Sequence, residues 1–139
     1  MTQMKFSGSC LCGAVRYDLS GDPKRFYHCH CRRCRKATGT GHATNLMIAS
    51  ENLTWVSGEE LLVRYKVPDA ERFSTCFCRN CGSLMPRFVT ELGLVVLPAG
   101  SLDNEPAIVP QARIFWDSRA DLSCSAGDLP VFAEYPPTS

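Results

Sequence analysis

The sequence lacks a long apolar run, a strong charge excess and any low-complexity segment, and each absence excludes a class of protein. Its longest apolar stretch, around LGLVVLPAG, is far shorter than the roughly 20 residues that a membrane helix needs, so we expect no membrane association. The first residues, MTQMKFSGSC, contain no apolar core of a secretory signal, which favours a cytoplasmic location. A net charge of +1 argues against a nucleic-acid partner, because such proteins usually carry a basic excess.

The length of 139 residues predicts a single domain over residues 1–139. Glycine and proline separate short strand-like runs, which we place at residues 14–19, 25–29, 42–48, 53–56, 61–67, 72–77, 84–88, 94–98 and 112–116. Only residues 31–39, CRRCRKATG, have the pattern of a short helix, with Gly39 at its carboxyl end. We therefore expect a mainly β fold of short antiparallel strands with one short helix.

Cysteine is the residue in excess, with nine in the chain, and eight of the nine lie in tight clusters. Neighbours this close in sequence rarely pair with each other, so the clusters favour metal binding in a reducing compartment over a disulfide framework. Two of the clusters share the pattern Cys-x-Cys-Arg-x-Cys, in CHCRRC and CFCRNC. The clusters are Cys10 and Cys12, then Cys29, Cys31 and Cys34, then Cys76, Cys78 and Cys81, while Cys124 stands alone.

Four of these cysteines are expected to form one closed structural zinc site. CRNCG is a Cys-x-x-Cys knuckle followed by glycine, and CLCG is a tighter version of the same turn. The predicted ligands are Cys10, Cys12, Cys78 and Cys81. Cys76 precedes Cys78 by two residues on the same face of a strand, which makes it an alternative near the metal, but the Cys-x-x-Cys pair is preferred because its turn geometry is self-sufficient. A redox dithiol of Cys78 and Cys81 is disfavoured, because no thioredoxin-like pattern surrounds it.

The middle cluster has three cysteines, Cys29, Cys31 and Cys34, and no fourth ligand in its own motif. We favour a second zinc site with an open fourth position, as in catalytic zinc sites. The alternative is a closed site completed by His28, His30, His42, Cys76 or Cys124. The basic residues around the cluster would keep its thiols deprotonated and attract an anionic substrate; they are Arg32, Arg33, Arg35 and Lys36.

The segments GSCLCGAVRY, HCHCRRCRKATGTG, FCRNCGSLMPR, LPAGSLD and DLPVF occur in this order. Together they resemble the motifs of the glutathione-dependent formaldehyde-activating enzymes, a family that includes centromere protein V and has an Mss4-like zinc-binding β fold. The resemblance implies two zinc ions per chain. A structural zinc would lie on Cys10, Cys12, Cys78 and Cys81, and a second, more labile zinc on Cys29, Cys31 and Cys34, with water or a thiol in its fourth position.

The resemblance also implies a carbon–sulfur lyase whose substrates are a small thiol and an aldehyde. By default these are glutathione and formaldehyde, which give S-hydroxymethylglutathione. Arg32, Arg33 or Lys36 would then pair with the carboxylates of glutathione. His30 or His42 would move the proton, with Arg33 as a further catalytic candidate. One departure from the family pattern is Ala120-Asp121-Leu122, where many members carry Ala-Pro-Trp.

Two other functions are compatible with the same residues. One is a zinc-stabilised binding module without catalysis, which would use the basic helix to bind a protein or a nucleic acid. The lack of aromatic residues interleaved with the basic ones argues against nucleic acid. The other is a thiol redox role for Cys76 and Cys124, which we disfavour because a lone cysteine usually acts as a small buried apolar residue.

Overall fold

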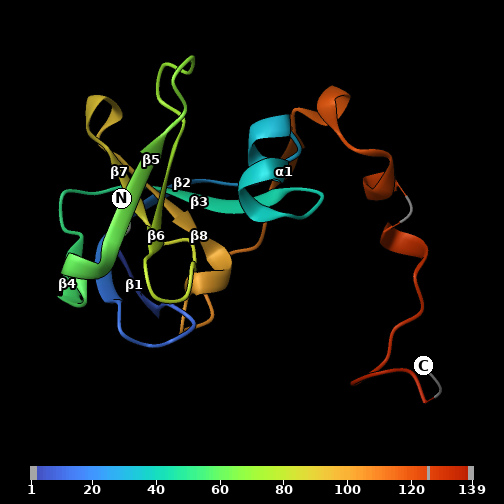
Figure 1. Ribbon diagram of the computed structural model, residues 1–139, viewed down its shortest axis with the longest axis horizontal. Coiled ribbons are helices and arrows are strands. Elements are labelled where there is room, and N and C mark those ends of the chain that lie inside the picture. Colours follow the sequence, from blue (N-terminus) through green and yellow to red (C-terminus); the bar gives the residue numbers. More distant parts are fainter. Residues whose placement is uncertain (1–2, 125, 138–139) are drawn as a thin grey trace.

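The structure, a computed structural model, describes residues 3–124 and 126–137, and at positions 124 and 126 it describes the backbone alone. Its main sheet has the strand order β1-β2-β3-β8-β7, and β4 and β9 also pair with β2 (Figure 1). These strands span Met4–Ser9 (β1), Arg16–Cys29 (β2), Ala43–Ala49 (β3), Thr54–Ser57 (β4), Arg87–Val89 (β7), Leu94–Pro98 (β8) and Ala112–Ile114 (β9). A separate two-stranded sheet pairs β5, Leu62–Lys66, with β6, Ser74–Cys78.

The expected fold class is confirmed. The sheets are mainly antiparallel, and α1, Arg32–Thr38, is the one α-helix in the part of the chain that the structure describes. The architecture agrees with the expected Mss4-like fold of short strands around cysteine clusters. One pairing differs, because β9 runs parallel to β2. Short 3-10 helices connect the strands at Glu59–Leu61, Thr90–Leu92, Ala99–Ser101, Trp116–Ser118, Asp121–Cys124 and Ala126–Asp128.

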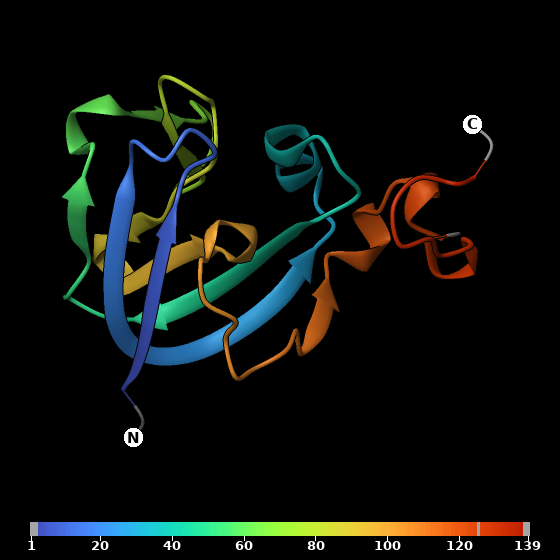
Figure 2. The ribbon, with the colours of Figure 1, turned by 90° about the horizontal axis from the view of Figure 1, so that it is seen from below.

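Strand β2 corrects one expectation about the strands. The sequence predicted two separate runs, at residues 14–19 and 25–29, with glycine and proline between them in SGDPK, but β2 is continuous over 14 residues. The pairing of β2 with β3 shifts register between Pro23 and Arg25, where proline cannot donate a ladder hydrogen bond. The first half of β2 pairs with β1 and β4, and its second half pairs with β3 and β9. The strand therefore curls the sheet and carries the chain directly to the middle cysteine cluster (Figure 2).

The core is built from the inward faces of β1, β2, β3 and β8. Burial alternates along β1 and the first part of β2, as the period of two in a strand requires. Burying a large apolar side chain stabilises a fold by about 1.5–3 kcal/mol. The largest apolar side chains that are almost fully buried are Phe6, Tyr17, Leu46, Ile48, Met85 and Leu97. Cys76 and Cys78 of β6 belong to the same core cluster, so the small β5–β6 sheet packs on the main sheet.

Helix α1 begins directly after β2 and ends as the sequence predicted. Cys31 is its N-cap, and the Cys31 side chain accepts a hydrogen bond from the backbone N–H of Cys34. Gly39 ends the helix in the left-handed conformation, at φ 73°, and its N–H donates to the carbonyl of Arg35. The chain after β9 passes beyond α1, on the side away from the β5–β6 sheet (Figures 1 and 2). None of the helices in the described part of the chain is long and apolar enough to cross a bilayer.

Candidate functional site

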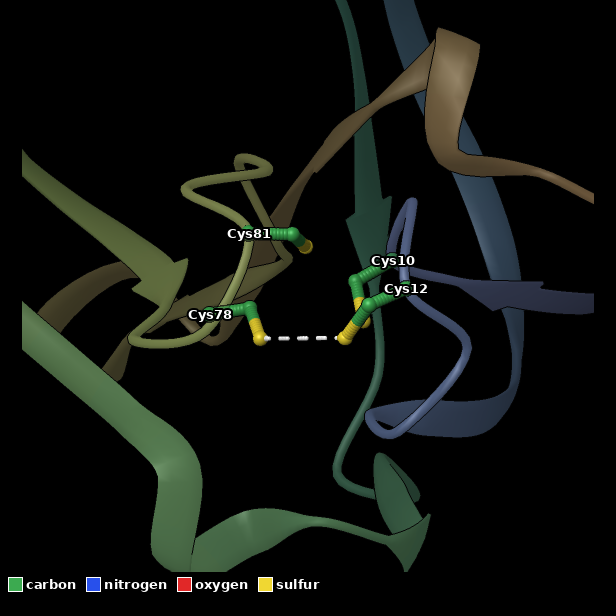
Figure 3. Close-up of side chains that lie close together, drawn as sticks. All are labelled: Cys10, Cys12, Cys78 and Cys81. Carbon is green, nitrogen blue, oxygen red and sulfur yellow. Dashed lines mark hydrogen bonds between the residues drawn. The ribbon is translucent and has the colours of Figure 1, made fainter.

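Two turns far apart in the sequence bring four cysteines together, as predicted. Cys10 and Cys12 follow β1, Cys78 ends β6, and Cys81 lies in the turn after it (Figure 3). The sulfur atoms of all four lie within 4.8 Å of one another. The Sγ of Cys12 is 3.6 Å from that of Cys10 and 3.9 Å from that of Cys78. This group can hold a metal ion with four thiolate ligands.

Backbone hydrogen bonds shape the two turns before any metal binds. The N–H of Gly13 donates to the carbonyl of Cys10, and the N–H of Gly82 donates to that of Cys78. Both glycines have positive φ, 81° and 77°, as the knuckle pattern predicted. The hydroxyl of Ser83 accepts from the N–H of Leu11, 2.9 Å away, and so ties the two turns together. The four thiols are therefore held close by their own loops.

The environment of the four thiols favours ionisation at Cys81. The Oγ of Ser83 lies 3.3 Å from the Sγ of Cys81. The Ser83 hydroxyl and backbone N–H lower the pKa of Cys81 to about 5. At Cys12 a backbone hydrogen bond from Ala14 lowers the pKa, but the neighbouring thiols and burial raise it to about 11. Four thiols this close cannot all ionise without a cation, so the group fits a metal better than four free thiolates.

Cys76 does not join this group. It lies two residues before Cys78 on the same buried face of β6, as expected. Its side chain is 1% exposed and packs in the apolar core, where burial raises its pKa. The four-cysteine group thus contains the preferred Cys78 and Cys81 and not the alternative Cys76. Cys124 cannot be compared in this way, because its side chain lies outside the described residues.

The second cysteine group forms where β2 ends and α1 begins. The sulfur atoms of Cys29, Cys31 and Cys34 lie within 4.8 Å of one another. Burial raises the pKa of Cys31, but hydrogen bonds from the backbone N–H of Cys34 and from the neighbouring thiols lower it below its usual value. Burial, with the two neighbouring thiols, raises the pKa of Cys34 strongly. Cys31 is therefore the thiol of this group that ionises most readily.

No fourth side chain joins this group among the residues whose side chains the structure describes. The suggested fourth ligands His28, His30, His42 and Cys76 all lie outside the group. Cys124, the remaining alternative, lies outside the described side chains. The described part of the site thus offers three thiol ligands on one side of a cavity.

A cavity of about 730 Å³, the main cavity, opens beside the three cysteines. Arg32 and Arg33 line it from α1, whereas Lys36 is exposed and is not among the lining residues. Most of the wall is apolar, with contributions from Tyr27, Met47, Phe73, Leu84, Met85 and Val96. All three cysteines of the second group line this cavity, so a small molecule in it can reach their sulfur atoms.

Arg87, at the start of β7, is a cavity residue that the sequence did not indicate. Its guanidinium lies 5.5 Å from the centroid of the Phe73 ring. Burial lowers the pKa of Arg87, whereas the nearby Cys34 thiolate raises it. Arg87 follows proline in an apolar stretch far from the cysteines in sequence, so only the packing of β7 against β8 brings its charge to this site.

The three histidines lie together beside the main cavity, which one of them, His42, lines. The rings of His28 and His42 stack with centroids 4.1 Å apart, and those of His30 and His42 lie 5.0 Å apart. His42 lines the main cavity, and His30 does not. His30 is fully buried, and burial, followed by the basic neighbours His42 and Arg113, lowers its pKa.

The profile of the family described as glutathione-dependent formaldehyde-activating enzyme matches residues 5–118. The chain belongs to this family. The match spans both cysteine groups and the strands that position them. The expected resemblance is therefore confirmed at the level of the family.

Two individual relatives extend the comparison. A protein of Halomonas elongata, with the provisional name of glutathione-dependent formaldehyde-activating enzyme, is 35% identical over 119 residues. That alignment covers 80% of this chain and 73% of the relative. A crystal structure of a Rhodobacter sphaeroides protein superposes with a TM-score of 0.56 at 22% identity, over 75% of this chain and 97% of that one. This structural similarity supports the fold assignment alone.

Proposed function

We propose that this chain is a zinc-dependent carbon–sulfur lyase that adds glutathione, or another small thiol, to formaldehyde. The product would be S-hydroxymethylglutathione. The observation that carries the proposal is the placing of Cys29, Cys31 and Cys34 on the wall of a cavity that is also lined by Arg32 and Arg33. Membership of the family, and the provisional name of the Halomonas relative, support the choice of glutathione and formaldehyde.

The donor atoms of both cysteine groups fit zinc, because thiolates are soft ligands. Four thiolates complete its preferred tetrahedron in the first group, and three leave one position open in the second. Cys10, Cys12, Cys78 and Cys81 hold the structural ion, and Cys29, Cys31 and Cys34 hold the second one. Zinc on three thiolates supplies an acidic fourth position that favours a bound thiol as its thiolate or polarises an aldehyde. The eight described cysteine side chains are free thiols, which supports a reducing, cytoplasmic location.

The chain's own residues bind the thiol and exclude water. Arg32 and Arg33 pair with the carboxylates of glutathione, because they line the cavity next to the cysteines. Lys36 is placed less well for this role, since it is exposed outside the lining. The apolar wall limits the water that competes for formaldehyde. Binding both substrates in one cavity makes the addition effectively intramolecular.

Proton movement is assigned to His42 rather than His30, because His42 lines the main cavity. The Nδ1 of His42 lies 3.3 Å from the carbonyl oxygen of Ala43, an acceptor, so Nδ1 carries the proton and Nε2 is the basic nitrogen. In the addition a sulfur–carbon bond forms and the carbonyl π bond breaks. The thiol proton moves through His42 to the resulting oxygen, so the step is balanced without any oxidant.

The test is two-dimensional exchange NMR on glutathione and formaldehyde at equilibrium with their adduct. The wild-type protein should raise the exchange rate in proportion to its concentration. Cys31→Ser should return the rate to background, because serine keeps the N-cap of α1 but removes a thiolate ligand. Elemental analysis should find two zinc ions in the wild type and one in Cys31→Ser. The matched control Cys76→Ala should keep both the rate and the two ions.

A wild-type rate at background, with both zinc ions present, would overturn the lyase proposal. The alternative, a zinc-stabilised binding module for a protein or nucleic acid, would then stand. Salt-dependent binding of duplex DNA that is lost in a double Arg32→Gln and Lys36→Gln variant would support its nucleic-acid form.

A further inference from the structure

A second cavity of about 390 Å³ lies between His30, His42, Arg113 and Ser123, and we call it the inner chamber. It adjoins the main cavity, because His42 and the two threonines at positions 40 and 44 line both. The inner chamber contains no residue of either cysteine group among the described residues. The inner chamber is therefore distinct from both cysteine groups, although its His30 lies between Cys29 and Cys31 in the sequence.

The hydrogen bond between Arg113 and His30 sets the protonation of His30. The guanidinium Nη1 of Arg113 lies 3.2 Å from the Nε2 of His30. A guanidinium can only donate, so Nε2 accepts and the proton of the neutral ring is on Nδ1. That Nδ1 is fully buried and makes no hydrogen bond of good geometry to a described residue, although the backbone of Gly41 lies close enough to interact with the ring. A buried N–H group without a partner costs free energy, so this donor is suited to a ligand.

A second unpartnered polar atom lies at the same chamber. The Oγ of Ser123 is buried and makes no hydrogen bond to any described residue. A Cβ built on Gly41 would lie 2.8 Å from this Oγ and 3.1 Å from the Cδ1 of Leu122. Glycine at position 41 therefore lets the Ser123 side chain approach the backbone closely, and a larger residue there would displace the hydroxyl.

The charges around the inner chamber have one sign. Among the described residues that line the inner chamber, Arg113 alone has a fixed charge, and none has a carboxylate. Arg113 forms no ion pair with any described residue. Its guanidinium lies 5.7 Å from the centroid of the Trp116 ring, which holds the charge at the chamber. The chamber thus offers a cation without an acidic partner, a buried N–H and a buried hydroxyl. Together these groups can bind a carboxylate.

We propose that the inner chamber binds a carboxylate group, with Arg113 as its cation and the His30 Nδ1–H and the Ser123 hydroxyl as further donors. The carboxylate can come from a small free acid such as formate or acetate. It can also be one end of a thiol whose sulfur lies in the main cavity, because the two cavities adjoin at His42. The carboxylate site itself does not require that the chain be a lyase.

Trp116 provides a direct readout of the inner chamber. Its ring packs edge-on against His30, with centroids 4.9 Å apart, whereas Trp55, the other tryptophan of the chain, packs on Tyr17. In protein labelled with 15N-tryptophan, the two indole N–H signals can be followed during titration with acetate and formate. Sodium chloride at matched ionic strength is the control. The Trp116 signal should shift saturably, and the Trp55 signal should not move.

Two variants and a matched control tie the signal to the chamber. Arg113→Gln should weaken acetate binding by about tenfold or more, because it removes a charged donor. Gly41→Ala should also weaken binding, because the new methyl group crowds Ser123. Arg25→Gln, which changes an exposed arginine that lines neither cavity, should leave acetate affinity unchanged. An unchanged Trp55 signal in each variant shows that it is folded.

Comparing glutathione with N-acetylcysteamine, a thiol without a carboxylate, distinguishes the two sources. If glutathione shifts the Trp116 signal and displaces acetate, and N-acetylcysteamine does neither, the carboxylate belongs to the thiol. If acetate or formate binds and glutathione does not compete, the ligand is a free acid. The proposal is overturned if acetate, formate and glutathione all leave Trp116 unmoved, or if Arg113→Gln binds acetate as well as the wild type does. If the lyase assay fails but the Trp116 signal still shifts saturably, the carboxylate-site proposal stands and only the proposed function is lost.

Discussion

Replacing Cys76 or Cys78 by alanine should have very different effects, although the two cysteines are two residues apart on one strand. Both lie on the buried face of β6, with side chains 1% and 0% exposed. Cys78 contributes its sulfur to the four-cysteine group, 3.9 Å from the Sγ of Cys12. Cys76 packs in the core. Burial alone would predict that the two substitutions reduce the free energy of unfolding equally. A larger loss for Cys78→Ala would therefore measure the contribution of a bound metal.

The expected magnitudes follow from what each sulfur does. Cys76→Ala removes one buried atom from the core, which costs about 0.5–1.5 kcal/mol, as for other small deletions. A structural zinc contributes about 10–16 kcal/mol in small zinc domains, so an equal share for one of four ligands is about 2.5–4 kcal/mol. Cys78→Ala should therefore lose at least that much, and more if the ion leaves altogether. For a chain of this length the melting temperature should fall by roughly 10 °C or more.

The assay is urea unfolding with excess zinc, combined with elemental analysis of each variant. Cys76→Ala should keep two zinc ions and respond to a chelator as the wild type does. Cys78→Ala should bind one ion fewer, or hold one so weakly that dialysis removes it. Equal losses of stability in the two variants, with metal content unchanged in both, would refute the assignment of Cys78 as a ligand.

Two further predictions concern single groups at the two cysteine sites. In zinc-free protein Cys81 should react fastest with iodoacetamide at pH 7, and much faster than Cys76. The reason is that the Ser83 hydroxyl and N–H lower the pKa of Cys81 to about 5, whereas burial raises that of Cys76. Peptide mass spectrometry should show that the rate of Cys81 labelling falls only when the pH drops through about 5. A fall in that rate between pH 9 and pH 7 would contradict the prediction. Arg87→Met should weaken zinc binding at the three-cysteine site by about tenfold, because it removes a cation near Cys34. Competition with a chromogenic chelator measures this, and an equal loss in the exposed control Arg79→Met would count against a local charge effect.

Much of the fold was predictable because local patterns agreed with the tertiary structure. Helix α1 was predictable from Gly39 and the basic last turn, and both features are present. The continuity of β2 was not, because SGDPK has the composition of a turn. Tertiary pairing with β3 keeps this segment extended, and the register shift after Pro23 accommodates the missing donor. The parallel pairing of β9 with β2 also depends on contacts across most of the chain.

The candidate site was predictable where the ligands are close in sequence. The spacing of the knuckles selected the four-cysteine group, and the middle cluster supplied the three-cysteine group. The wall of the main cavity was not predictable, because Arg87 and the apolar residues opposite α1 reach it only through sheet packing. Stacking of His28 on His42 likewise needs β2 and β3 to be paired, with His28 opposite the residue at position 44.

The two copies of the pattern Cys-x-Cys-Arg-x-Cys show why the ligand count could not be read from spacing alone. In CFCRNC the first two cysteines lie inside the extended strand β6, where residues two apart are separated by about 6.6–6.8 Å. Cys76 is therefore left in the core while Cys78 and Cys81 join the ligand group. In CHCRRC the strand ends at the first cysteine, and α1 begins at Arg32. The chain turns there, so all three sulfur atoms converge. Whether such a motif brings two or three of its sulfur atoms into one group is thus decided by where its strand ends.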